Sequence, residues 1–114
     1  DFHEATDYVA DVLLGIEPDA LILADLQERD ALAYARIAGD SHVPFEVRHY
    51  SPQGESQRRR FREAVEGNAG RRPLYVDAAF LPQVEALGPA YRTERRGPVW
   101  QVLLTGGAAG EGAE

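Results

Sequence analysis

The sequence contains no cysteine, no methionine and no lysine. Without cysteine, disulfide bonds, thiolate metal sites and a cysteine nucleophile are excluded. Long apolar runs are also absent: the longest, Ala20 to Ala24, is far shorter than the ~20 residues that cross a bilayer. No signal peptide is visible at the start of the sequence. We therefore expect that this chain does not itself insert into a membrane.

The rest of the composition is that of an ordinary globular protein. The 114 residues are 44% hydrophobic and 27% charged, which fits one domain with one core. We place this single domain at residues 1–105. Because the sequence starts at Asp1 and lacks methionine, we expect that it is a piece of a longer protein. The rest of that longer chain is then the expected partner of this domain. The tail at residues 106–114 consists of Gly, Ala and Glu, and we predict that it is disordered.

The balance of charge argues against nucleic acid as a partner. The 19 acidic residues outnumber the 12 basic ones, all of them arginine, and give a formal net charge of -7. Contacts with phosphate groups need a basic face, and the chain as a whole is acidic. We therefore predict no nucleic-acid partner.

One local cluster of arginines stands apart from this balance. It consists of Arg58, Arg59, Arg60 and Arg62, with Arg71 and Arg72 nearby. Such a cluster could bind phosphates or an anionic membrane surface. However, Glu55, Glu63 and Glu66 share the predicted helix, at spacings that allow pairing with the arginines. We therefore interpret the cluster as a solvated helix face.

Hydrophobic patterns predict alternating helices and strands. The continuous apolar run at residues 20–24 is typical of a strand buried on both faces. Apolar and polar residues alternate over residues 43–49, which predicts a half-exposed strand, and Pro44 suits an edge strand. A short strand is predicted at residues 73–77, and a hairpin at residues 90–94 and 99–104. The predicted helices cover residues 5–15, 31–38, 55–66 and 79–87.

Strands that alternate with helices predict the α/β class. We expect a three-layer α/β/α Rossmann-like sandwich with right-handed crossovers. The sheet is expected to be mostly parallel, in the order 2-1-3, with the C-terminal β-hairpin beside the third strand. The edge strands of such a sheet would also allow a homodimer.

Polar residues that follow the predicted parallel strands are the candidate binding residues, because ligands of open α/β sheets bind beyond the carboxyl ends of the strands. These residues are Asp25, Gln27, His49, Tyr50 and Asp77. Asp25, His49 and Asp77 could hold a divalent metal or perform acid–base chemistry. Alternatively, Asp25 and Asp77 cap the helices that follow them.

No complete catalytic or cofactor motif is present. Where a glycine-rich nucleotide loop would follow the first strand, residues 25–30 read Asp-Leu-Gln-Glu-Arg-Asp. The absence of lysine excludes a receiver domain, and no G-x-S-x-G elbow surrounds a serine. We therefore assign no catalytic residue, no metal ligand set and no cofactor, and keep the sheet edge as the candidate binding site.

A series of short motifs runs from Tyr8 to Tyr50. A helix leads to a Pro-x-Ala-hydrophobic strand at residues 18–23, an acidic turn at 24–27, an aromatic-containing helix that ends at Gly39, and a strand at 43–47. Residues 72–76 then form an Arg-Pro-hydrophobic-Tyr-Val strand, and Tyr91 opens the final hairpin. In this order the motifs resemble the soluble domain of bacterial polytopic membrane proteins related to protein O-mannosyltransferases.

The resemblance implies a role. It suggests an accessory domain of a membrane glycosyltransferase-like protein, on the extracytoplasmic side, that contacts an acceptor or a partner without catalysis of its own. One position departs from the pattern: Asp25 matches the first acid of the turn, but Gln27 replaces the second. The residues alone leave a second hypothesis open, a small enzyme or a ligand- or metal-binding domain that uses Asp25, His49 and Asp77.

Overall fold

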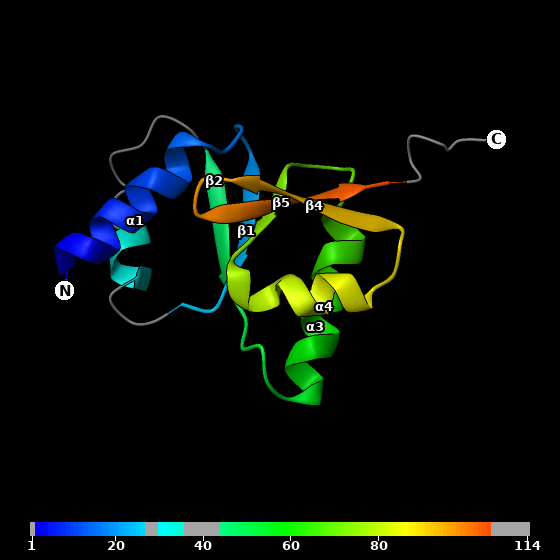
Figure 1. Cartoon of the computed structure of the whole chain (residues 1–114). Helices are drawn as coiled ribbons and strands as arrows, with labels where there is room; N and C mark the ends of the chain where they lie inside the picture. Colours follow the sequence, from blue (N-terminus) through cyan, green and yellow to red (C-terminus); the bar gives the residue numbers. More distant parts are fainter. Residues whose placement is uncertain (1, 27–29, 36–43, 106–114) are drawn as a thin grey trace.

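The computed structural model of the chain describes residues 2–26, 30–35 and 44–105. A helical segment at residues 30–35 follows the first strand. The other elements, in chain order (Figure 1), are α1 (Phe2–Leu14), β1 (Ala20–Ala24), β2 (Phe45–His49), α3 (Glu55–Asn68), β3 (Leu74–Val76), the 3-10 helix η1 (Ala78–Phe80), α4 (Leu81–Ala86), β4 (Tyr91–Arg96) and β5 (Val99–Leu104).

The strands form one sheet in the order β2-β1-β3-β5-β4. β1 pairs in parallel with β2 and β3, and β5 pairs antiparallel with β3 and β4. The predicted order 2-1-3 and the hairpin beside the third strand are therefore confirmed. The strands β1, β2 and β3 are parallel, and the hairpin adds the antiparallel pairings of β5 with β3 and with β4. The sheet as a whole is therefore partly parallel.

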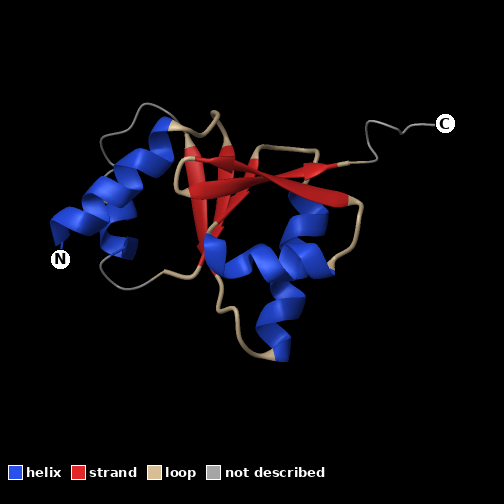
Figure 2. Cartoon of the chain, in the orientation of Figure 1, coloured by secondary structure: helices blue, strands red, loops and turns tan. Residues whose placement is uncertain are grey.

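Helices cover both faces of this sheet, which confirms the α/β class (Figure 2). On one face, Val9 and Val12 of α1 pack with Ile22 of β1 and Tyr75 of β3. On the other face, α3, η1 and α4 pack on the sheet through a cluster that includes Leu21, Leu23, Phe61, Phe80 and Val84. In the described ranges no helix is both long enough and apolar enough to cross a membrane.

The ends of several elements differ from the prediction. The helix predicted at residues 79–87 is divided into η1 and α4, and Pro82 lies in the first turn of α4, where its missing N–H costs no hydrogen bond. The hairpin turn is tighter than expected, because Gly97 adopts a φ of 64° and lets β4 continue through Arg96. Predictions for residues 36–39, Val43 and the tail at 106–114 fall outside the described residues.

Trp100 makes a side-chain contact across the hairpin. In the register of the hairpin Trp100 lies opposite Arg95, and Tyr91 lies opposite Leu104. The Arg95 guanidinium carbon is 5.5 Å from the centroid of the Trp100 ring. This arrangement is a cation–π contact between the two strands.

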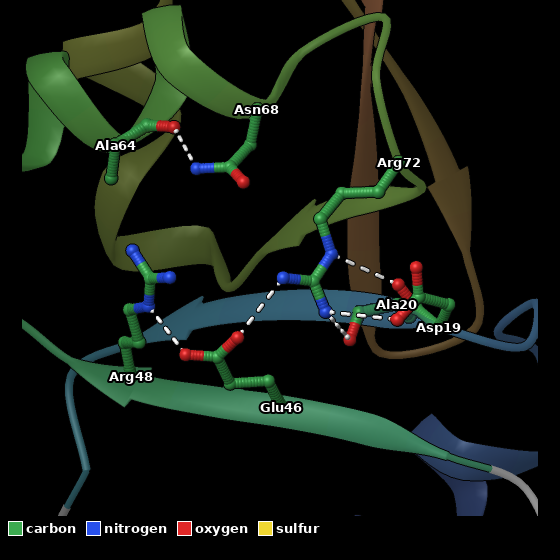
Figure 3. Close-up of polar contacts among 7 residues, drawn as sticks. All are labelled: Asp19, Ala20, Glu46, Arg48, Ala64, Asn68 and Arg72. Atoms are coloured by element: carbon green, nitrogen blue, oxygen red, sulfur yellow. Dashed lines mark hydrogen bonds and ion pairs between the residues drawn. The ribbon is translucent and has the colours of Figure 1, made fainter.

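Arg72, which precedes β3, holds the starts of three parallel strands together (Figure 3). Its Nε donates to the carbonyl oxygen of Asp19 at 3.0 Å, and Nη2 donates to that of Ala20 at 3.3 Å. Its Nη1 donates to Oε1 of Glu46 on β2 at 3.0 Å. Hydrogen bonds from Arg48 and Arg72 lower the pKa of the Glu46 carboxyl. The planar fork of arginine suits this set of acceptors, and the point charge of a lysine would not.

Replacing Arg72 with methionine should lower the free energy of unfolding by about 2 kcal/mol, because charge-assisted hydrogen bonds to two carbonyls and a carboxylate are lost. Arg71→Met is the matched control, since the Arg71 side chain is exposed and the same charge is removed. Urea unfolding of both variants measures the difference. Equal stability of the two variants would show that Arg72 does not fix the strand ends.

Candidate functional site

The carboxyl ends of the three parallel strands lie at one edge of the sheet, where Asp77 joins two of them. Oδ2 of Asp77 accepts a hydrogen bond from the backbone N–H of Asp25 at 2.9 Å. Oδ1 of Asp77 accepts from the N–H of Ala79 at 3.0 Å, which makes Asp77 the N-cap of η1. The sequence-based alternative that Asp77 is a helix cap is confirmed. Its carboxylate also links β3 to the end of β1.

His49 and Tyr50 at the end of β2 also contact the end of β1. Nδ1 of His49 accepts from the N–H of Leu26 at 2.9 Å, and the N–H of Tyr50 donates to the carbonyl of Ala24 at 3.0 Å. The Tyr50 ring packs edge to face against Phe61, on the face of the sheet covered by α3. Tyr50 is thus a core contact on that face, away from Asp77.

The four predicted binding residues that the structure describes therefore do not converge on one point. Asp25 and Asp77 lie together, and His49 reaches them only through the Leu26 backbone. Gln27 lies outside the described residues. Within the described ranges, no three histidine or acidic side chains are placed so that they could hold a metal ion. Asp25, His49 and Asp77 do not form the metal site that the second hypothesis considered.

A small cavity of about 160 Å³ opens beside Asp77 on the side of α1. Side chains that the sequence analysis did not select line it together with Asp25 and Asp77; they are Tyr8, Asp30 and Tyr34. Tyr8 comes from the helix before β1, and Tyr34 from the helix after it. In the sequence, the one indication that these tyrosines could meet was their location in the helices before and after the same strand. That both rings reach the end of this strand follows from the packing of the helices and is seen only in the structure.

The electrostatics of this cavity favour protonated phenols. Burial raises the pKa of Tyr34 and of Tyr8, and the nearby carboxylates of Asp77 and Asp30 raise both further. Burial also raises the pKa of Asp77, although the N–H groups of Asp25 and Ala79 partly offset this effect. At neutral pH the phenols therefore keep their O–H donors. The cavity can offer hydroxyl donors and carboxylate acceptors, and it repels anions.

Comparisons of the chain with protein-family models, with curated proteins and with solved structures find no match.

The titration of Asp77 should affect stability in a defined direction. Because its folded pKa lies above the ordinary value of 3.8, its contribution to stability is greatest below that pH. This contribution is lost as the pH rises through the folded pKa. The free energy of unfolding of the native protein should therefore fall relative to Asp77→Asn over this range. Carbon-13 NMR of the Asp77 carboxyl gives the midpoint directly.

Asp25→Asn is the control for this measurement. Removing the Asp25 charge should move the Asp77 midpoint downward, since repulsion from Asp25 is one of the causes that raise it. An Asp77 midpoint at or below 3.8 in the native protein would contradict the assigned burial.

Proposed function

We propose that this chain is a non-catalytic accessory domain of a membrane glycosyltransferase-like protein, and that it contacts a partner or an acceptor on the extracytoplasmic side. The observation that supports the absence of catalysis is the engagement of Asp77. A general base needs a free lone pair directed at its substrate. Each oxygen of Asp77 uses one of its lone pairs to accept a backbone N–H, which holds the carboxylate in a structural position between strand ends. Nδ1 of His49 is occupied in the same way.

The membrane parent in this proposal rests on the resemblance of the motifs between Tyr8 and Tyr50 and at residues 72–76. The Arg-Pro motif at Arg72 is where the strand starts are held together, so this part of the resemblance concerns folding. We also propose that the parallel part of the domain is Rossmann-like. The order β2-β1-β3 and the helices on both faces support this relationship.

The gene that encodes this chain provides the test of the membrane parent. Translation of the sequence on both sides of residues 1–114 should show several apolar spans of ~20 residues, each able to cross a bilayer. Arginine and lysine next to these spans give the side of the membrane on which the domain lies. A gene with no such spans, or with the domain on the cytoplasmic side, would disprove that part of the proposal.

A second candidate function is binding of a small ligand at the sheet edge. The cavity beside Asp77 favours it, because two phenols and three carboxylates there surround about 160 Å³. Its occupant would be a neutral or cationic molecule that carries hydroxyl or amino groups, since carboxylates repel anions.

A thermal-shift screen distinguishes this second candidate from the first. If the cavity binds a sugar or an amine, that compound should raise the melting temperature of the native protein. Tyr34→Phe should reduce the shift, because it removes one hydroxyl from the cavity wall. The control is Tyr91→Phe. Because Tyr91 lies outside the cavity, this substitution should leave the thermal shift unchanged. No shift with any of these compounds would leave only the accessory function.

A further inference from the structure

A second and larger hollow lies on the opposite face of the molecule, between α3 and α4. These helices lie together on one side of the sheet (Figure 1). The groove between them has a volume of about 470 Å³. Its walls include Arg58, Arg59 and Arg62 of α3. They also include Gln83 of α4 and Leu87, which directly follows α4. We refer to it as the α3–α4 groove.

The arginines of this groove have no carboxylate partner. Every ion pair found among the described residues involves Arg48, Arg72, Arg92 or Arg96. The pairing with Glu55, Glu63 and Glu66, which led us to interpret the cluster as a solvated face, is not present within 4.0 Å. Three arginines against one glutamate line the groove. It is therefore cationic on a protein whose formal net charge is -7.

The spacing of these arginines has a cost in the free protein. Arg58 and Arg62 are four residues apart, and Arg59 and Arg62 are three apart, so their charges lie on neighbouring turns of one helix face. Like charges at these spacings destabilise a helix. An anionic group bound between them would remove that repulsion and accept the guanidinium N–H groups.

Gln83 also lies in the wall of the groove. Its Nε2 donates to the carbonyl oxygen of Pro52 at 2.8 Å, which fixes the side-chain amide. Its Oε1 has less than 1 Å² of accessible surface and no hydrogen-bond partner within the described part of the chain, so a ligand in the groove does not reach this oxygen. Gln83 therefore serves as a fixed polar side chain that reports on binding beside the arginines.

The groove also has an apolar floor. The ring of Phe61 is buried beneath it and stacks on Phe80, with ring centroids 4.5 Å apart. Ala86 and Leu87 contribute further apolar surface from α4 and its end. Because Phe61 is only 1% exposed, the apolar surface left for an occupant comes from Ala86 and Leu87, and an apolar side chain beside the charge would cover it.

We propose that the α3–α4 groove binds an acidic peptide segment of a partner protein. Such a segment supplies carboxylates for Arg58 and Arg62 and an apolar side chain for Ala86 and Leu87. A flat anionic membrane fits less well. Glu63, Glu66 and Glu85 are exposed on the same two helices, where they would repel lipid phosphates.

This inference rests on the partner-binding part of the proposed function and names the surface and the chemistry of the partner. It does not depend on the membrane parent. The gene sequence tests the parent, whereas binding of a peptide to the isolated chain tests the groove. The two can therefore fail separately.

The test is fluorescence anisotropy of a labelled, blocked peptide in which glutamate alternates with leucine, titrated with the chain of residues 1–114. The peptide should bind, and added salt should weaken binding. Arg58→Gln/Arg62→Gln should weaken it roughly tenfold or more, because two charge-assisted contacts are lost. Arg60→Gln/Arg71→Gln, the matched control, removes two charges outside the groove and should change affinity by less than about twofold.

Nitrogen-15 NMR locates the binding site. The side-chain amide of Gln83 and the backbone of α3 and α4 should shift on addition of the peptide, while Tyr8 and Tyr34 should not. Absence of binding, equal loss in both double variants, or shifts confined to the cavity beside Asp77 would overturn the inference. Equal binding of a glutamine–leucine peptide would also overturn it.

Two further probes separate other anions from a peptide. If inorganic phosphate at millimolar concentration displaces the peptide and alone shifts Gln83, the groove is a phosphate site and the inference is wrong. If vesicles of phosphatidylserine and phosphatidylcholine bind the chain through Arg58 and Arg62 while the peptide does not, it is a membrane-binding surface and the inference is again wrong.

Discussion

The fold depends on the complete burial of β1. Its five residues are buried on both faces of the sheet, and both of its edges are paired with other strands. Backbone groups at the ends of such a strand need partners from the protein itself. Arg72 supplies donors for the carbonyl groups of Asp19 and Ala20 at the start, and Asp77 supplies an acceptor for the N–H of Asp25 at the end. The guanidinium of Arg72 and the carboxylate of Asp77 thus supply hydrogen-bond partners for the backbone at the two ends of β1.

This requirement explains why polar side chains at the edge of the sheet are engaged with the backbone. In open α/β sheets the crevice between adjacent strand ends is the usual place for a ligand. Here the Asp77 carboxylate spans the ends of β1 and β3. The remaining cavity lies to the side of α1 and is acidic, whereas the groove on the opposite face is lined by arginines. Anions are therefore excluded from one face and attracted to the other.

The sequence allowed prediction of features that depend on local pattern. The apolar run of β1, the strand order 2-1-3, the hairpin and the capping role of Asp77 follow from composition and spacing. Features that depend on packing across the chain were not predictable. The Arg72 contacts require the register of β1, β2 and β3, and the cavity requires that Tyr8 and Tyr34 meet from two helices. Spacing alone allowed the glutamates of α3 to pair with its arginines, but among the described residues no such ion pair is formed.

The contrast between a cationic groove and an acidic protein has a consequence for specificity. At physiological ionic strength charges are screened beyond about 8 Å, so a short acidic segment in the groove interacts mainly with Arg58, Arg59 and Arg62. An extended polyanion, such as a nucleic acid or a charged bilayer, also meets the surrounding carboxylates and is repelled by them. The net charge of -7, which argues against a nucleic-acid partner, is therefore compatible with binding of a short acidic segment in the groove. Attraction by the arginines of the groove, combined with repulsion by the acidic residues around it, therefore favours a short acidic segment over a long polyanion.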